Sequence, residues 1–315
     1  MDLVSGAAST AHVPVLLHES IDLLQPERGG LFVDCTLGAG GHSRALLNRL
    51  PDDAQLICLD RDDRAHRQAH QTGLADEPRV RLVKAAFGDL PEILGSDCGR
   101  VTGLLADLGP SSMQLDEAGR GFSFQRDEPL SMVMDSDQEA DAAHWLNLVS
   151  ESELADVLFH LGEERQARRV AAALVRARPL ERTGELAEAI CQSLGQWPRP
   201  GKKHPATQCF MAIRMAVNDE LGQLDRLMEN LGLILAPGGI AGIISFHGLE
   251  HRRVRRWVRR VSTDDYGPKE MARREPLVRA TFDNLTRRGM APSADEIAVN
   301  PRARSAQLRC VRRRG

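Results

Sequence analysis

The sequence predicts an α/β fold in which a parallel β-sheet carries an inserted helical lobe. Three observations predict it. Short apolar runs alternate with helical patterns over the first part of the chain, another apolar run follows a Pro-Gly-Gly turn at residues 237–239, and a long, mostly helical interval separates the two. Continuous apolar runs are typical of parallel strands buried on both faces. An interval of about a hundred residues is too long for a structureless loop in a compact fold.

The predicted elements of the sheet alternate in chain order. Helical patterns at residues 43–50 and 62–71 each follow a strand, as in βαβ units. The predicted strands are residues 31–35, 56–59, 79–83, 101–106 and 240–246.

The interval between the fourth and fifth strands predicts a separate helical unit. It is rich in Gly, Ser and Asp at 111–129, helical in pattern at 137–195 and rich in proline at 196–205. We therefore expect an inserted all-helical domain at 116–205, between a first part of the main domain at 1–115 and a second part at 206–315. Within the second part, apolar residues step by three and four from Phe210 to Leu231, which predicts one long amphipathic helix.

Composition is that of a folded protein, but charge is unevenly distributed. The 315 residues are 42% apolar and carry 41 basic against 44 acidic side chains. Residues 1–197 hold 18 basic and 32 acidic side chains, whereas residues 198–315 hold 23 and 12. The basic part offers a surface to a polyanion such as nucleic acid. A base-composition bias toward arginine would explain Arg in place of Lys, but not the excess of positive charge.

Six arginines fall within residues 251–260. Val254, Trp257 and Val258 share one face of the helix predicted there, which leaves the arginines around the rest. Contact with phosphates and an ordinary solvated helix face are both consistent with this pattern.

Several features predict a cytoplasmic protein with no membrane segment. The six cysteines lie far apart and form no C-x-x-C pair, which is typical of reduced thiols and argues against a cysteine zinc site. The stretch 231–247 is broken by Pro237 and glycines, so it does not form a clean membrane helix. The first 13 residues lack the basic and apolar regions of a secretory signal.

A glycine-rich turn follows the first predicted strand. Its spacing is G-x-G-G, at Gly38, Gly40 and Gly41, and differs from the G-x-G-x-x-G of dinucleotide binders. Glycines there let the backbone approach a ligand at a helix N-terminus. Asp34, just before the turn, is placed to hold an ammonium group, which favours S-adenosyl-L-methionine over a pyrophosphate. A merely tight turn is the alternative.

Two more residues follow neighbouring predicted strands. Asp60 closes the second strand, where an acidic side chain commonly accepts both ribose hydroxyls. A helix-capping aspartate is the alternative. Phe87 follows the third strand and could flank an adenine ring or belong to the core.

The loop after the fourth predicted strand begins at Asp107. Ligands of open α/β sheets bind beyond the carboxyl ends of the strands, so this loop is expected to face the reacting methyl group. The alternative is a capping aspartate in a turn. The loop's candidate functional residues are Asp107, Ser111, Ser112 and Gln114.

Residues 247–251 match H-x-x-E-H, a metallopeptidase pattern. The pattern requires one helix through both histidines, whereas His247 directly follows a predicted strand and Gly248 is a poor helix former. We therefore predict no metal site.

Together these segments resemble the ribosomal RNA small subunit methyltransferase H family, also called MraW. The resemblance covers nearly the whole chain, and its ordered set of short motifs is specific although no single one is. The matching pieces lie at residues 12–17, 34–43, 59–62, 107–116, 120–124, 162–165, 204–207, 216–221, 245–247 and 300–305.

The resemblance implies a class I, Rossmann-like methyltransferase sheet with an inserted all-helical substrate domain that binds RNA. It implies methylation of N4 of a cytidine in the decoding region of 16S rRNA, within the small ribosomal subunit, with S-adenosyl-L-methionine and no catalytic metal. By position, the family's cofactor contacts fall on Gly40, Gly41, His42, Asp60, Phe87, Asp107 and Gln114.

The chain departs from the family's pattern mostly on the side expected to meet the substrate. These departures leave open a reduced activity, another nucleic-acid substrate, or a non-catalytic rRNA-binding or assembly protein. The remaining alternative is an NAD-dependent oxidoreductase. The turn lacks the third glycine of the G-x-G-x-x-G pattern at its usual spacing, which argues against this alternative. A homodimer is consistent with the sequence but not indicated by it. The departures are Pro110, Ser131, Val133, Gln208, Cys209, Met211, Gly248 and His251.

Overall fold

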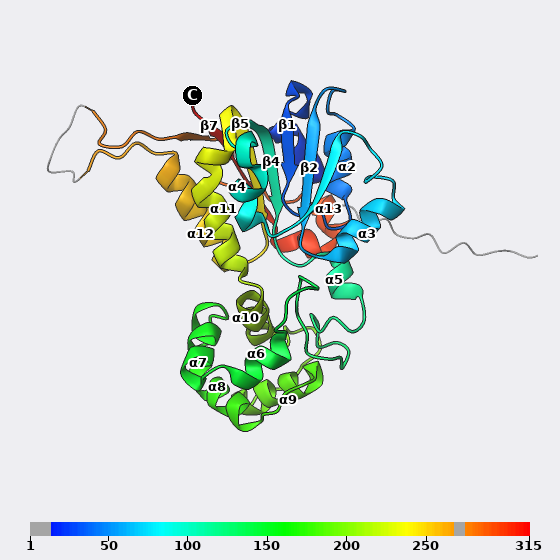
Figure 1. Ribbon diagram of the computed structural model, residues 1–315. Helices are drawn as coiled ribbons and strands as arrows, with labels where there is room; N and C mark the ends of the chain where they lie inside the picture. Colours follow the sequence, from blue (N-terminus) through cyan, green and yellow to red (C-terminus); the bar gives the residue numbers. More distant parts are fainter. Residues whose placement is uncertain (1–13, 268–274) are drawn as a thin grey trace, which may run out of the picture.

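The computed structural model describes residues 14–267 and 275–315. The expectation that no secretory signal precedes the fold concerns residues 1–13 and lies outside this part. The described chain forms a seven-stranded sheet in the order β3-β2-β1-β4-β5-β7-β6 (Figure 1). Its strands are β1 (Leu31–Asp34), β2 (Gln55–Asp60), β3 (Val80–Lys84), β4 (Val101–Asp107), β5 (Leu235–Ser245), β6 (Phe282–Asn284) and β7 (Gln307–Arg313).

The sheet is parallel except at β7, which runs antiparallel to both of its neighbours, β5 and β6. All five predicted strands are confirmed. Four differ by at most one residue at each end, whereas β5 begins at Leu235, five residues before the predicted start, and includes the Pro-Gly-Gly segment that was expected to be a turn. β6 and β7 were not predicted. Arginines interrupt the apolar residues of β7, so the strand lacks the continuous apolar run by which the others were found.

Apolar side chains alternate between the two faces of the sheet, and helices cover both. Val33 belongs to one buried cluster with α4 (Leu90–Leu94), α11 (Glu220–Ile234) and α12 (Gly248–Val261). Phe32 belongs to the opposite cluster, with helices from both ends of the described chain. Those helices are α1 (Leu17–Leu24), α2 (Gly41–Leu47), α3 (Asp63–Gln71) and the short turn η5 (Pro301–Ser305). The predicted α/β fold is confirmed.

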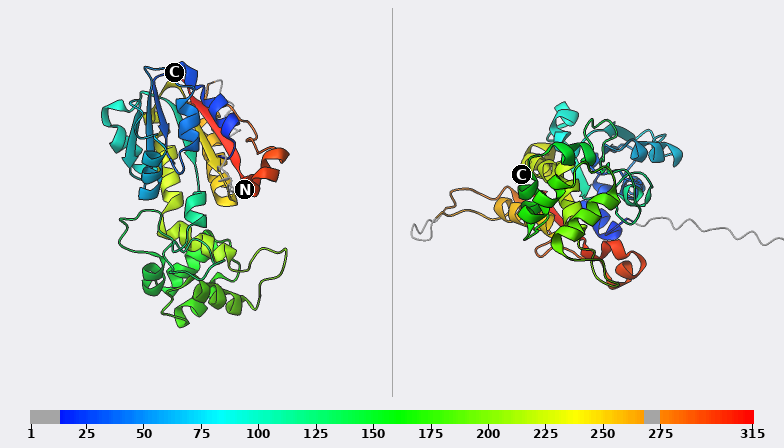
Figure 2. Two further views of the ribbon diagram at one scale, coloured as in Figure 1. Left: turned by 90° about the vertical axis from the view of Figure 1, so that its right-hand side faces the viewer. Right: turned by 90° about the horizontal axis from the view of Figure 1, so that it is seen from below.

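A helical lobe lies beyond the carboxyl ends of the strands (Figures 1 and 2). A third buried cluster, distinct from the two that flank the sheet, holds it together. Helix α10, which the sequence analysis assigned to the second part of the sheet domain, packs Phe210 and Ile213 into this cluster. The lobe's helices are α6 (Ala142–Leu148), α7 (Glu151–His160), α8 (Ala167–Arg176), α9 (Thr183–Leu194) and α10 (Thr207–Val217).

The prediction of one long helix from Phe210 to Leu231 is wrong. The structure has two helices there, α10 and α11, which are separated by a break at Asn218 and Asp219. Asp219 adopts a left-handed conformation, with φ of 48°. The buried Asn218 amide donates to the Met132 carbonyl and its oxygen accepts from the Met134 N–H. These hydrogen bonds hold the end of α10 against residues 132–134 of the lobe, and α11 begins after the break, although the apolar spacing continues through it.

Helix α12 confirms the predicted amphipathic pattern. Val254, Trp257 and Val258 are buried against the sheet, and most of the arginines face outward. In the described ranges, no helix is both long enough and apolar enough to cross a bilayer.

Candidate functional site

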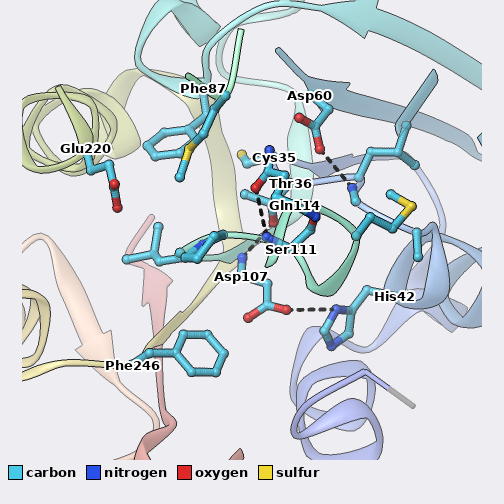
Figure 3. A pocket seen from close by; sticks show the side chains of 18 of the residues that line it. Cys35, Thr36, His42, Asp60, Phe87, Asp107, Ser111, Gln114, Glu220 and Phe246 are labelled. Atoms are coloured by element: carbon cyan, nitrogen blue, oxygen red, sulfur yellow. Dashed lines mark hydrogen bonds and ion pairs between the residues drawn. The ribbon is translucent and has the colours of Figure 1, made fainter. Parts of the chain in front are cut away.

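A cavity of about 520 Å³ lies at the carboxyl ends of β1, β2 and β4 (Figure 3). Segments far apart in the sequence line it: the turn after β1, the ends of β2 and β4, the residues after β3, and parts of α11, α12 and η5. The predicted site residues that line it are Gly38, Gly41, His42, Asp60, Phe87, Asp107, Ser111 and Gln114.

The glycine turn forms one wall of the cavity. Gly40 has φ of 81°, in the left-handed region, and immediately precedes α2. At Gly41, an added Cβ would lie 2.2 Å from Pro14 Cγ, so only glycine fits between the turn and the N-terminal segment. The turn therefore presents backbone and the start of a helix to the cavity, which suits a ligand that must approach closely.

Asp34 does not line the cavity, although the sequence analysis expected its carboxylate to hold an ammonium group. Its side chain is buried below the turn, where it accepts hydrogen bonds from the Ser43 hydroxyl at 2.5 Å and the Thr36 N–H at 3.1 Å. Burial raises its pKa. In this structure, Asp34 organises the turn rather than forming part of the cavity surface.

Asp60 closes β2 and borders the cavity. One carboxylate oxygen accepts the Gly38 N–H at 2.9 Å and the other accepts the Asp62 N–H at 3.0 Å. The helix-capping role considered as an alternative belongs to its neighbour Asp62, whose side chain accepts the Arg64 N–H. Asp60 is thus fixed at the place where ribose hydroxyls are bound in sheets of this kind.

Phe87 lines the cavity and also packs against the buried cluster on the α11 side of the sheet. Both alternatives for this side chain, a cavity wall and a core residue, therefore apply. Its ring stands across the cavity from the turn after β1 (Figure 3).

Asp107 ends β4, and its backbone N–H donates to the Thr36 hydroxyl at 2.8 Å. One carboxylate oxygen, Oδ2, lies 3.7 Å from His42 Nδ1. The other, Oδ1, is buried and has no hydrogen-bond partner in the described structure. Burial, and secondarily the carboxylates of Asp34 and Glu250, raise the pKa of Asp107 well above its usual range. An unpartnered acceptor in a cavity indicates a missing hydrogen-bond donor.

The loop after Asp107 is held by α5 (Ser112–Asp116). Ser111 is the N-cap of this helix and forms a capping box with Gln114, which stabilises the helix start. Gln114 also donates from its side-chain amide to Asp62 at 3.0 Å, so its side chain is fixed beside the cavity. Ser112 is the first residue of α5.

Glu250, which sequence reasoning discounted with the metallopeptidase pattern, lines the cavity from the first turn of α12. Its carboxylate accepts the Phe246 and His247 N–H groups at 2.8 and 3.2 Å, and His247 Nε2 lies 3.1 Å away. These contacts with His247 and the backbone outweigh burial and lower its pKa. The signal that could have found Glu250 is its place three residues after the helix N-cap.

Two further segments of the cavity wall were missed by sequence reasoning. Pro14 and Val15 come from the N-terminal side of the described chain, and the next residue, Leu16, donates its N–H to Glu296 at 2.8 Å. Arg302, from η5, lines the cavity and forms a bidentate ion pair with Asp116 at the end of α5. Single apolar or basic residues carry no signal of such long-range contacts.

His251, a departure from the family's pattern, ties η5 to the sheet. Its ring contacts the Ser245 hydroxyl at 2.7 Å and the Ser305 carbonyl at 3.1 Å. Across the described ranges, no group of three or more His, Cys, Asp or Glu side chains is arranged to hold a metal ion.

The strand order, with an antiparallel β7 inserted beside β5, and a cavity built from the turn after β1 and the ends of β2 and β4, define a class I methyltransferase that uses S-adenosylmethionine. The site fits this cofactor, because the glycine turn presents backbone and the start of α2 to the cavity and Asp107 presents an unpartnered acceptor. A model of the MraW methylase family matches residues 9–314, and the chain belongs to this family.

Relatives match along nearly their full length. A protein from Halorhodospira halophila named ribosomal RNA small subunit methyltransferase H is 44% identical over 316 residues, which cover 97% of this chain and 95% of that protein. One of the same name from Thioalkalivibrio sulfidiphilus is 42% identical and covers 98% and 99%. The structure of a putative rRNA methylase from Clostridium thermocellum has a TM-score of 0.41 at 12% identity, covering 97% and 99%. The fold rests on the strand order above, not on this likeness.

Proposed function

We propose that this protein methylates N4 of a cytidine in the decoding region of 16S rRNA, acting on the small ribosomal subunit in the cytoplasm. The family and the names of full-length relatives support the reaction and the substrate. The structural observation that carries the proposal is Asp107 Oδ1, a buried acceptor in the cavity with no partner in the described structure.

The chemistry of the target explains why such an acceptor is useful. S-adenosylmethionine supplies an electrophilic methyl group when bound. The cytosine amino group is a poor nucleophile, because its lone pair is delocalised into the ring. Asp107 accepting an amino N–H would localise that pair and orient it, and orientation of this kind is worth up to about 7–11 kcal/mol in favourable cases. The loop from Ser111, through Ser112, to Gln114 would shape the pocket around the base.

Asp60 and the glycine turn would hold the cofactor, with Asp60 on the ribose and Phe87 beside the adenine. Gly38 and Gly41 would form the close wall, and Gly40, which does not line the cavity, would set the left-handed turn between them. Asp34 would contribute by fixing that turn through Ser43.

The helical lobe is the proposed RNA-binding part, comprising residues 116–205 with α10 packed on it. Figure 2 shows the lobe beyond the carboxyl ends of the strands, which is the edge of the sheet where the cavity lies. A base in structured RNA must leave its stack to reach a buried methyl donor, at a cost of a few kcal/mol. We propose that contacts of the lobe and of α12 with the RNA offset this cost.

The decisive experiment is methyl transfer to small subunits that lack the modification, followed by mass spectrometry of the released nucleosides. We expect N4-methylcytidine, formed at a single site of the 16S rRNA. Running naked 16S rRNA in parallel shows whether the assembled particle is required. Tight rRNA binding with no product after long incubation would instead identify a non-catalytic assembly protein, and a product at another base would identify a different substrate.

The exposed arginines of α12 provide a prediction about RNA affinity. Arg255, Arg256, Arg259 and Arg260 are exposed, unlike the valines and tryptophan that they flank. Replacing all four with glutamine is expected to weaken binding to small subunits and to reduce the slope of log affinity against log salt by up to about 0.9 per lost phosphate contact. Filter binding over a series of potassium chloride concentrations measures both.

A charge-matched variant separates the effect of these arginines from general charge. Arg28, Arg44, Arg67 and Arg100 are exposed on the sheet domain, outside both α12 and the helical lobe, and their replacement by glutamine removes the same four charges. We expect a smaller change of slope in that variant. An equal change in both variants would show that α12 has no special role in binding RNA.

A further inference from the structure

His42, which by position is one of the family's cofactor contacts, also lies against the Asp107 carboxylate. Its ring is buried at the start of α2 and lines the cavity. Nε2 lies 3.1 Å from the Val15 carbonyl oxygen, and Nδ1 lies 3.7 Å from Asp107 Oδ2. Figure 3 shows the ring facing the Asp107 carboxylate, whose other oxygen turns toward the space beside Phe246.

The contact with Val15 determines where the proton of a neutral ring lies. A carbonyl oxygen only accepts, so Nε2 carries the hydrogen in this contact. Nδ1 of the neutral ring is then an acceptor facing another acceptor, the Asp107 carboxylate. A second proton on Nδ1 turns this arrangement into an attractive ion pair.

The other titratable groups around Asp107 disfavour a negative charge there. Asp34 approaches from β1 and Glu250 from α12, and both raise the Asp107 pKa in addition to the larger effect of burial. The charge of Glu250 is partly balanced by His247, 3.1 Å away, and by Arg214. His42, from α2, lies against Asp107 itself and is a cation when both of its ring nitrogens are protonated.

We propose that the imidazolium of His42 keeps the Asp107 carboxylate ionised, and that Asp107 thereby accepts the proton that the target amino group must lose. His42 acts here through Asp107 and is a positioning residue. The inference deepens the proposed function and depends on it for the identity of the amino group.

The step balances without any further reactant. The amino nitrogen forms a bond to the methyl carbon, the bond between that carbon and sulfur breaks, and its electron pair stays on sulfur. The nitrogen then carries one proton too many. That proton passes to Asp107 Oδ1, while the proton on His42 Nδ1 stays in place and stabilises the carboxylate until the transfer.

The test is the pH dependence of single-turnover methyl transfer in His42→Gln. Glutamine can still donate its amide hydrogen to the Val15 carbonyl but carries no charge. An opposite charge within about 4–6 Å lowers a carboxyl pKa by about 1–3 units. Loss of the His42 charge should therefore shift the acid limb of the pH–rate profile to higher pH by about 1–3 units. We expect the methyl-transfer rate to fall about tenfold or more at pH values on this limb and to recover at high pH.

His66→Gln is the matched control, because His66 Nε2 also contacts a backbone carbonyl, that of Asp60 at 2.9 Å, but the ring does not line the cavity. Its rate profile should coincide with that of the unmodified protein. A structural role of His42 would lower the rate equally at every pH. Such a parallel loss, or an unchanged profile, overturns the inference.

A second measurement is independent of activity. Carbon-13 NMR of the aspartate carboxyls, with the Asp107 signal assigned by its absence in Asp107→Asn, reports the ionisation of Asp107 in the free protein. The midpoint should rise in His42→Gln and stay unchanged in His66→Gln. An unmoved midpoint in His42→Gln contradicts the inference even if rRNA methylation is observed. A raised midpoint without rRNA methylation would support the His42 effect and reject the proposed substrate.

Discussion

Asp107→Ala is expected to slow methyl transfer by about 10²–10⁴-fold, the range that proton transfer by a positioned side chain contributes. The substitution removes both the acceptor that orients the amino group and the acceptor of its proton. Binding of the small subunit should change little, because the predicted RNA contacts lie on the lobe and α12. Single-turnover rates with saturating enzyme measure this effect free of product release.

Asp107→Asn separates the two roles of this side chain. Asparagine has nearly the same shape, and its oxygen can still accept an amino N–H, but it cannot take up the proton. We expect a rate between those of Asp107→Ala and the unmodified protein. Asp53→Asn, in an exposed turn, is the control for loss of one carboxylate and should retain the full rate. A wild-type rate in Asp107→Ala would refute the assigned role.

Asp60→Ala is expected to weaken binding of S-adenosylmethionine by about 10–150-fold. This corresponds to about 1.5–3 kcal/mol, the contribution of a hydrogen bond to a charged group. The substitution also frees the Gly38 N–H, which Asp60 accepts at 2.9 Å, so the glycine turn loses a support. Isothermal titration calorimetry with S-adenosylmethionine and with S-adenosylhomocysteine measures the change.

Denaturant unfolding of Asp60→Ala without ligand shows how much of the effect is structural. A large loss of unfolding free energy with unchanged affinity per folded molecule would mean that Asp60 supports the turn without contacting the ligand. Asp62→Ala is unsuitable as a control, because Asp62 holds Arg120 and Gln114. Asp53→Ala, in the exposed turn before β2, serves better.

Local sequence patterns were sufficient to predict most strands of the sheet and one wall of the site. The strands of residues 31–35 and 101–106 were found because burial on both faces requires continuous apolar runs. The glycine turn was found because its left-handed and crowded positions restrict the residue type. The carboxyl ends of parallel strands meet at one edge of the sheet, so the sequence predicts that Asp60 and Asp107 border the same site.

What the sequence did not reveal depends on contacts between distant segments. The break at Asn218 arises from hydrogen bonds to Met132 and Met134 in the lobe, which the apolar spacing of the helix does not encode. The burial of Asp34 beneath the turn depends on the Ser43 hydroxyl, which satisfies its carboxylate there. Glu250 was obscured because the pattern around it matched another kind of site.

Arg302 and Val15 face the same cavity, and Leu16 and Glu296, which join these walls, are 280 positions apart. A partly folded chain in which either segment is undocked therefore lacks a complete binding surface for the methyl donor. Because the donor binds only the fully folded state, it raises the free energy of unfolding of the whole protein. The increase is about 2.7 kcal/mol at a donor concentration 100 times its dissociation constant. Cellular donor levels thus influence the lifetime of the enzyme as well as its turnover.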